Sequence, residues 1–290
     1  MSDDFSNDLL ADHHVVVTGG GTGLGRAMAL RFADLGASVT INGRRTKPLE
    51  ETVADIEERG GTAEGISCNV REAEAVDAFF EDAEDRQGPV TALVNNAAAN
   101  FLSATEDISP NGFDAIVKTN LYGSFYCTQA CGRRWLEREE EGVVLSIATT
   151  YAETGSAYVV PSAMSKAGIV AMTRSLAAEW GSVGIRLNAV APGPFPTEGA
   201  WDRLMPSADL EEKMRQRIPV RRFGSPEELA DLASFLLSDL SGYMNGEVVT
   251  VDGGETLAAG GQFNTFTRMP REQVKSMMDA LRPESSENEE

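Results

Sequence analysis

Cysteine and histidine are both scarce in this chain of 290 residues. The three cysteines, Cys68, Cys127 and Cys131, are too few and too irregularly spaced for a disulfide framework or a CxxC metal site. Cys127 and Cys131 lie four apart in a helical pattern, so we expect them to share a helix face as buried thiols. The only histidines, His13 and His14, precede the first predicted strand and leave little for a histidine-based triad or a zinc site. The scarcity of cysteine and histidine predicts that the cysteines are reduced thiols and that the protein binds no metal.

Basic charge and long apolar runs are also in short supply. The 25 lysines and arginines face 45 aspartates and glutamates, and the resulting net charge of −20 repels nucleic acid and anionic membrane surfaces. No run of about 18 apolar residues indicates a membrane span, and the acidic start MSDDFSNDLLADHH is unlike a secretory or mitochondrial presequence. We therefore expect a cytoplasmic protein that binds neither nucleic acid nor membrane.

The chain does contain a regular alternation of short apolar runs with helical patterns. The apolar runs are HVVVTGG, ASVTING, TAEGISCNV, TALVNNAA, GVVLSIATT, IRLNAVAPG and EVVTVDGG. Helical patterns occupy residues 23–35, 49–59, 73–85 and 110–137, the stretch from VVPSAMSKAG onward, and PEELADLASFLLSD. Seven strands alternating with helices predict the α/β class, with a Rossmann-like, doubly wound parallel sheet covered by helices on both faces.

One domain should hold this sheet, because a chain with 42% hydrophobic residues and this length can bury a single full-sized core. We predict a domain at residues 13–283, whose C-terminal helical extension ends in an amphipathic helix. Residues 1–12 are predicted to be an N-terminal tail. Residues 284–290, ESSENEE, are predicted to be a disordered acidic tail.

The first apolar run leads into a glycine-rich turn, TGGGTGLG at 18–25, that opens the first predicted helix. Glycine lets the chain turn tightly and approach a pyrophosphate closely, and the N-terminus of a helix favours the negative charge. The pattern therefore predicts a dinucleotide site. Its residues are Gly19, Gly21, Thr22, Gly23, Leu24 and Gly25.

The end of the second predicted strand indicates which dinucleotide binds. A carboxylate there would accept hydrogen bonds from the ribose of NAD, but the chain has Arg44 and Arg45 instead. Arginine forks hold a phosphate with charge-assisted bonds, so the pair predicts NADP(H), although an ordinary solvated loop also fits it. Further predicted cofactor contacts are Asn69 and Val70 after the third strand, and Asn96 and Ala97 after the fourth.

Several segments together resemble the short-chain dehydrogenase/reductase family. They are TGGGTGLG, NNAA, the helix that carries Lys166, PGP after the sixth apolar run, and the closing VDGG. Members of that family typically use a serine, a tyrosine and a lysine, with the tyrosine four residues before the lysine. In this chain Thr149 holds the usual serine position and Ser162 holds the usual tyrosine position.

The chain resembles one branch of that family more closely, the NADPH-dependent 2,4-dienoyl-CoA reductases. The segments NNAAANF, IATTYAETGSAYVVPSAMSKAG, APGPFPTEGAWDRL and GGQFN carry this likeness. In that branch the tyrosine comes from the end of the fifth strand, which is Tyr151 here. Parallel strands bind ligands at their carboxyl ends, and a loop at 152–160 should return the chain to the helix. Tyr151 and Lys166 can therefore meet over the nicotinamide.

The resemblance implies reduction of a 2,4-dienoyl-CoA by NADPH to a 3-enoyl-CoA, within β-oxidation of unsaturated fatty acids. Tyr151 and Asn100 would donate hydrogen bonds to the thioester oxygen. Lys166 would bind the nicotinamide ribose and Ser162 would support the network. The implied nicotinamide-side residues are Pro192, Gly193, Pro194 and Phe195, and the implied acyl-CoA contacts are Arg71, Phe101, Ser109 and Arg203. Family likeness also implies a homotetramer.

Other interpretations of the same residues stay open. Tyr151 could be packed at a strand end, and Tyr158 is a rival tyrosine whose position matches neither pattern. Asn100 could be a turn residue. Asn120, in KTNLYG, resembles the asparagine of a family proton relay but suits a structural helix role equally well. The alternative functions are an NADPH-dependent ketone or carbonyl reductase and an NADP-binding protein without turnover.

Overall fold

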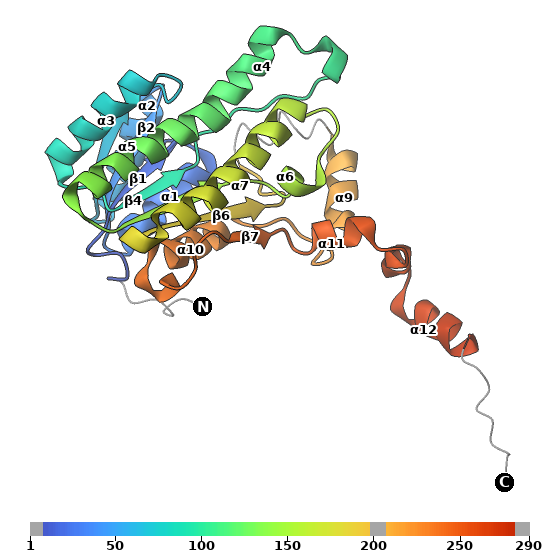
Figure 1. The fold of residues 1–290 in the computed structure, drawn as a ribbon. Helices are drawn as coiled ribbons and strands as arrows, with labels where there is room; N and C mark the ends of the chain where they lie inside the picture. The colour runs from blue at the N-terminus through green and yellow to red at the C-terminus, as the bar shows by residue number, and fades with distance from the viewer. Residues whose placement is uncertain (1–7, 198–206, 282–290) are drawn as a thin grey trace.

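The computed structural model describes residues 8–197 and 207–281, which form one seven-stranded parallel sheet with helices around it (Figure 1). The strands are β1 (His14–Thr18), β2 (Ser38–Gly43), β3 (Thr62–Ser67), β4 (Ala92–Asn95), β5 (Gly142–Ile147), β6 (Ile185–Pro192) and β7 (Val248–Val251). They lie in the order β3-β2-β1-β4-β5-β6-β7. The strand order changes direction between β1 and β4, and ligands of such sheets bind outside the carboxyl ends at that point. The predicted fold class is confirmed.

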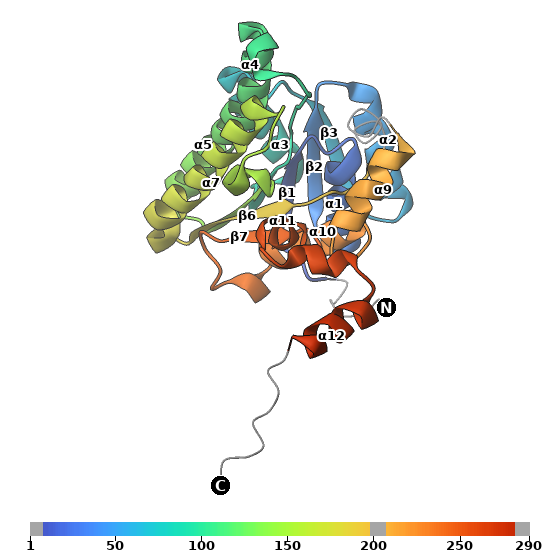
Figure 2. The same ribbon diagram turned by 90° about the vertical axis from the view of Figure 1, so that its right-hand side faces the viewer.

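Two groups of long helices cover the sheet, one on each face (Figure 2). One face is packed by α1 (Gly23–Asp34), α2 (Thr46–Glu58) and α10 (Pro226–Leu237), and the other by α3 (Ala73–Gln87), α5 (Gly123–Arg138) and α7 (Val160–Trp180). Shorter helices are α4 (Pro110–Val117), α6 (Tyr151–Thr154), α9 (Ala208–Arg217), α11 (Glu255–Gly260) and α12 (Arg271–Ala280). Single 3-10 turns lie at Thr105–Asp107, Gly181–Val183, Asp239–Ser241 and Asn264–Arg268.

The core is apolar on both sides of the central strands because helices cover both faces. Every residue of β1 is buried. Phe32 packs on one face of the sheet, and Phe80 and Trp135 pack on the other. The Trp135 indole donates a hydrogen bond to the Val90 carbonyl, which satisfies its N–H inside the core. Cys127 and Cys131 are buried beside them, as predicted.

Two helix starts predicted from the sequence are confirmed by their caps. The Ser109 hydroxyl accepts from the Gly112 N–H at the start of α4. Ser225 and Glu228 form the reciprocal capping box at the start of α10. These caps set the direction in which each helix leaves its preceding loop.

Two elements differ from the expectations in a way that matters for the site. His14 does not precede the first strand: it is the first residue of β1, and its buried ring bonds the Gly88 carbonyl and the Thr40 hydroxyl. The predicted helix at 110–137 is interrupted by a π-helical segment, Lys118–Tyr122, between α4 and α5. A π-helical segment adds a residue to one turn, and apolar periodicity gives no sign of it.

The segment after β7 leaves the body of the protein. Figures 1 and 2 both show α11, the turn at 264–268 and α12 running outward from the carboxyl end of β7. The amphipathic helix expected near the C-terminus is therefore present as α12, whereas the predicted acidic tail at 284–290 lies outside the described residues. Across 8–197 and 207–281, no helix is both long and apolar enough to cross a membrane.

Candidate active site

The glycine-rich turn between β1 and α1 is folded with almost no spare volume. Gly19 and Gly23 have φ angles of +68° and +56°, a region that favours glycine. A Cβ atom on Gly25 would lie 2.4 Å from the Gly19 carbonyl oxygen and 2.4 Å from the Asn96 amide nitrogen. Thr22 precedes α1 without a side-chain cap, so the first N–H groups of the helix lack that internal acceptor. This is the arrangement of donors that suits a pyrophosphate.

A buried asparagine at the end of β2 holds this turn in place. The Gly19 N–H donates to Asn42 Oδ1 at 3.2 Å, and the Gly20 N–H donates to the Asn42 carbonyl at 3.1 Å. Asn42 is fully buried, and its Nδ2 has no partner among the described residues. Asn42 is not among the residues predicted to contact the cofactor, although an amide within an otherwise apolar strand is a signal that indicates it.

Asn96 and Ala97 reach the same turn from the end of β4. Asn96 Nδ2 donates to the Thr18 carbonyl at 2.9 Å and to the Gly19 carbonyl at 3.3 Å. The Thr18 hydroxyl accepts from the N–H groups of Asn96 at 2.9 Å and Ala97 at 3.0 Å. The turn is therefore bonded to both neighbouring strands, β2 and β4.

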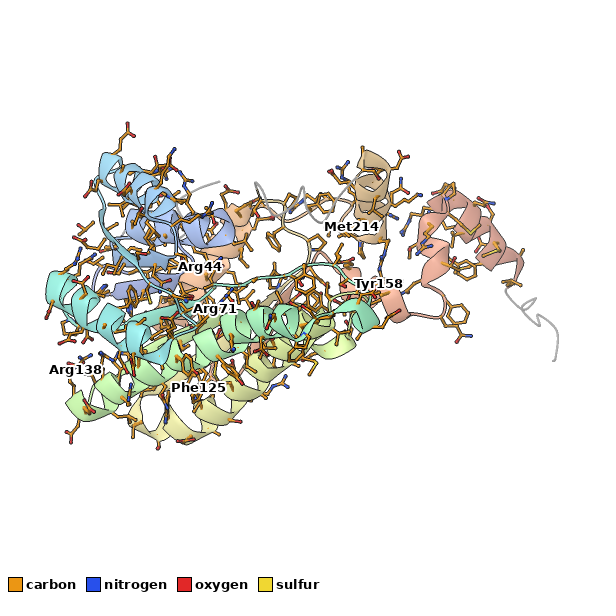
Figure 3. The ribbon with its side chains drawn as sticks, turned by 90° about the horizontal axis from the view of Figure 1, so that it is seen from above. Arg44, Arg71, Phe125, Arg138, Tyr158 and Met214 are labelled. Atoms are coloured by element: carbon orange, nitrogen blue, oxygen red, sulfur yellow. The ribbon has the colours of Figure 1, made fainter. Side chains whose placement is uncertain are left out.

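Arg44 lies at the end of β2 beside a cavity of about 480 Å³ (Figure 3). Asn69, at the end of β3, lines the same cavity, and its amide donates to Glu72 at 2.6 Å. Val70 is buried next to them. Arg44 and Arg45 are exposed, and neither forms an ion pair with any residue that the structure describes. Both guanidinium groups can therefore take an anion.

Tyr151 reaches the helix that carries the lysine. It begins α6, four residues after β5 ends at Ile147, and its hydroxyl lies 3.2 Å from Ser162 Oγ. Ser162 is 2% exposed and lies one turn before Lys166 on α7. The stretch expected to be a loop at 152–160 therefore starts as a helical turn, which brings the phenol back toward α7.

Lys166 is buried at the carboxyl end of β5. Its side chain is 6% exposed and donates to the Ile147 carbonyl. Burial lowers the pKa of the Lys166 ammonium to about 8. Within the described residues no hydrogen bond joins Lys166 to Tyr151. Ser162 links them indirectly, because it contacts the Tyr151 hydroxyl and lies on the same helix as Lys166.

Asn100 lies in the exposed loop after β4, where its Oδ1 accepts from the Phe101 N–H at 2.9 Å. No hydrogen bond between described residues joins it to Tyr151. The loop is anchored just before it, because buried Asn120 accepts from the Ala99 N–H at 2.7 Å and donates to the Ala99 carbonyl at 3.0 Å. Asn120 lies in the π-helical segment, and its side chain holds this loop.

The described residues that are predicted to contact the acyl-CoA lie in two regions, at the start of α4 and in the turn between β3 and α3. Phe101 is 37% exposed and lies over the start of α4, close to Gly112, and the Ser109 hydroxyl caps that helix. Arg71 lies in the turn between β3 and α3 and donates to the Thr119 hydroxyl at 2.7 Å. Arg203 falls outside the described residues.

The chain after β6 is bonded to two neighbouring segments at one edge of the site. The Gly193 N–H donates to the Val251 carbonyl at 2.9 Å, and the Gly224 N–H donates to the Pro194 carbonyl at 3.2 Å. Phe195 packs on Gly224, where a Cβ atom would lie 2.4 Å from its ring, and lines a second cavity of about 150 Å³. The predicted segment 192–195 therefore lies at the carboxyl end of the sheet, as the cofactor site does.

Tyr158, the rival tyrosine, lies on the loop between α6 and α7 (Figure 3). Its φ is +66°, its side chain is 63% exposed, and its carbonyl accepts from the Ser103 N–H at 3.0 Å. Its backbone thereby joins the loop after β4 to the loop before α7. No hydrogen bond involving the Tyr158 hydroxyl links it to Ser162 or Lys166 within the described residues.

Comparison with known proteins places this geometry in a family. Residues 19–256 match the family model described as enoyl-(acyl carrier protein) reductase. The chain belongs to the short-chain dehydrogenase/reductase family.

Members of the short-chain dehydrogenase/reductase family with named activities lie close to this chain. It is 43% identical over 244 residues to a probable 2,4-dienoyl-CoA reductase, (2E)-enoyl-CoA-producing, of Bacillus subtilis, covering 84% of this chain and 96% of that protein. It is 44% identical over 245 residues to a probable 2,4-dienoyl-CoA reductase of Caenorhabditis elegans, (3E)-enoyl-CoA-producing, covering 83% of this chain and 79% of that one.

A solved member of the family carries the cofactor. The structure of a putative 2-deoxy-D-gluconate 3-dehydrogenase from Agrobacterium tumefaciens with bound NADP has a TM-score of 0.81, 32% sequence identity, and covers 87% of this chain and 100% of its own. The protein described here is therefore a short-chain oxidoreductase that uses a nicotinamide cofactor. The glycine turn, in which Gly25 has no room for a Cβ atom and the start of α1 has no side-chain cap, fits that group.

Proposed function

We propose that this protein is an NADPH-dependent 2,4-dienoyl-CoA reductase. The observation that carries the proposal is the contact of 3.2 Å between the Tyr151 hydroxyl and Ser162 Oγ. It brings a phenol from the end of β5 to the helix position where most of the family has its tyrosine, next to buried Lys166. The 43–44% identity to two probable 2,4-dienoyl-CoA reductases supports the same substrate.

The residues around this phenol suit a reaction in which charge develops on a thioester oxygen. Tyr151 and Asn100 would donate hydrogen bonds to that oxygen, and each such donor typically contributes a few kcal/mol, about 2.7–4, to the transition state. Ser162 would orient the phenol. Lys166 would hold the nicotinamide ribose. When bound, NADPH supplies the hydride.

Arg44 and Arg45 support NADPH rather than NADH as the cofactor. Both are exposed just after β2, and the end of that strand, Asn42-Gly43-Arg44-Arg45, contains no carboxylate. A guanidinium pair there would bind the 2′-phosphate of NADPH, whereas a carboxylate would repel it.

The position of the final proton distinguishes two products. Protonation of the dienolate at the α carbon gives a 3-enoyl-CoA, and protonation at the γ carbon gives a 2-enoyl-CoA. The two named relatives are described with different products, (2E) and (3E). We propose the 3-enoyl product, with water as the proton donor, on the likeness to the 2,4-dienoyl-CoA reductase branch, one of whose members is described as (3E)-enoyl-CoA-producing.

The test is a rate comparison with a matched pair of tyrosine variants. Purified protein is mixed with NADPH and either a 2,4-dienoyl-CoA or a panel of ketones, and NADPH oxidation is followed by absorbance. Tyr151→Phe should lower turnover of the dienoyl-CoA by about 10²–10³-fold, the cost of one lost oxyanion donor. Tyr158→Phe, which removes the rival hydroxyl, should leave the rate within about twofold, and both variants should bind NADPH normally.

Two outcomes would assign a different function. Faster oxidation with a ketone and none with the thioester would make the protein a carbonyl reductase, a possibility favoured by the sugar-acid dehydrogenase among its structural neighbours. Binding of NADPH without turnover of either class would make it a non-catalytic NADP-binding protein. Nuclear magnetic resonance of the enoyl-CoA product locates the remaining double bond and decides between the 2-enoyl isomer, which is conjugated with the thioester, and the 3-enoyl isomer, which is not.

A further inference from the structure

Two consecutive residues of the π-helical segment hold two separate parts of the substrate side. Thr119 accepts a hydrogen bond from Arg71 Nε at 2.7 Å, and Arg71 lies in the turn between β3 and α3 (Figure 3). Asn120 holds the loop after β4 through the Ala99 N–H and carbonyl. The turn that carries Arg71 and the loop that carries Phe101 are therefore both tied to one segment, Lys118–Tyr122.

The hydroxyl of Thr119 is oriented for its contact with Arg71. It donates to the Ala115 carbonyl at 2.7 Å, and because a hydroxyl has one proton, its oxygen can only accept from Arg71 Nε. Four residues later, Gly123 lies against the same turn, where a Cβ atom would be 2.7 Å from Val70 Cγ2. The turn between β3 and α3 is thus held by a hydrogen bond and by close packing.

The remaining nitrogens of the Arg71 guanidinium have no partner among residues 8–197 and 207–281. The neighbouring charges are engaged elsewhere, because Glu72 accepts from Asn69 at 2.6 Å and Lys118 pairs with Asp114 at 2.9 Å. An arginine without a carboxylate is available to an anionic ligand, even in a chain with 45 acidic and 25 basic residues. Its Nη1 and Nη2 groups can form a bidentate contact with a phosphate.

We propose that Thr119 is a positioning residue, which holds Arg71 so that the two terminal nitrogens face a phosphate of the CoA part of the substrate. This inference rests on the proposed function. A guanidinium already held at Nε loses less side-chain entropy when the phosphate binds. Thr119 contributes to CoA affinity and not to hydride transfer, because Arg71 follows β3, Tyr151 follows β5, and three strands separate these two in the sheet.

The experiment measures the affinity of the full-length protein for CoA by calorimetric titration in the presence of NADP⁺. Thr119→Val keeps the shape of threonine and removes the acceptor, whereas Thr119→Ser keeps it. Thr173→Val is the matched control, because Thr173 also donates to the carbonyl one turn earlier, that of Ile169 at 2.9 Å, and within the described residues it holds no arginine. Arg71→Met, alone and combined with Thr119→Val, completes a double-mutant cycle.

Thr119→Val should weaken CoA binding about tenfold, as expected for a lost hydrogen bond to a charged group. Thr119→Ser and Thr173→Val should bind CoA within about twofold of the wild type. Arg71→Met should lose at least as much affinity as Thr119→Val, and adding Thr119→Val to it should cause no further loss. That last result is the one that a purely structural role of Thr119 would not give. NADPH affinity should be the same in every variant.

Four outcomes would overturn the inference: no CoA binding by the wild type, unchanged CoA affinity in Thr119→Val or in Arg71→Met, a loss from Thr119→Val that persists without Arg71, or a larger loss for NADPH than for CoA. The last would assign Arg71 to a phosphate of the cofactor. Circular dichroism verifies that each variant is folded, and Arg71→Met tests the inference even where Thr119→Val does not fold. CoA binding with the expected cycle, but without turnover of a dienoyl-CoA, would refute the proposed function and leave the role of Thr119 intact.

Discussion

The cofactor side and the substrate side of the site are held together in different ways. On the cofactor side the glycine turn is bonded to β2 by Asn42 and to β4 by Asn96, and Gly25 has no room for a side chain. On the substrate side the loops after β4 and β5 carry exposed residues and are fixed at few points, chiefly the Asn120 clamp and the bond from Ser103 to Tyr158. We therefore expect nucleotide binding to depend mainly on backbone shape, and substrate choice to depend on side chains of the loops.

This difference is tested most directly by replacing a glycine with alanine on each side in turn, in two separate variants. Gly25→Ala would force the Gly19 carbonyl and the Asn96 amide apart, since each lies 2.4 Å from the added Cβ. Overpacking of this kind costs about 1–3 kcal/mol, which predicts NADPH binding weaker by roughly 5- to 150-fold. Fluorescence titration of NADPH measures the dissociation constant directly.

Gly112→Ala is the matched change on the substrate side. Its Cβ would meet the Ser109 hydroxyl at 3.2 Å and the Phe101 ring at 3.4 Å, contacts that small shifts can relieve, and alanine favours a helix over glycine by about 1 kcal/mol. NADPH affinity should be unchanged and stability equal or higher. Similar losses of NADPH affinity in both variants would show that the two sides are equally tight and would remove the contrast.

The same contrast explains which features could be predicted from the sequence. The seven strands, the glycine turn and the position of Arg44 depend on backbone pattern and are present as expected. The α9 helix was not expected, because ADLEEKMRQR has no apolar stripe by which to recognise it. The π-helical segment that places Asn120, and the helical turn that returns Tyr151 to Ser162, depend on contacts between distant residues, which local patterns do not contain.

Lys166 lies where the two sides meet, and its titration gives a second test. Because burial lowers its pKa to about 8, the cationic form predominates below that pH and is lost above it. If the cation holds the cofactor ribose, NADPH affinity should be constant below pH 8 and then weaken, at most about tenfold per pH unit. Lys166→Met should bind weakly with no such step. If the NADPH dissociation constant of the wild type did not change from about pH 6.5 to 9.5, the charge of Lys166 would not contribute to cofactor binding.

The smallest expected effect concerns the backbone of the substrate side. Tyr158 holds a φ of +66° with a side chain 63% exposed, so replacing it by glycine or by alanine removes the same ring contacts. Only glycine adopts that φ without steric cost. The free energy of unfolding of Tyr158→Gly should therefore exceed that of Tyr158→Ala by about 1 kcal/mol, and Tyr158→Gly should unfold at the higher temperature. Equal unfolding temperatures would mean that the loop relaxes freely when the ring is lost. The hydrogen bond from the Ser103 N–H to the Tyr158 carbonyl would then not constrain the loops of the substrate side. The geometry of those loops would instead be set by the bound substrate.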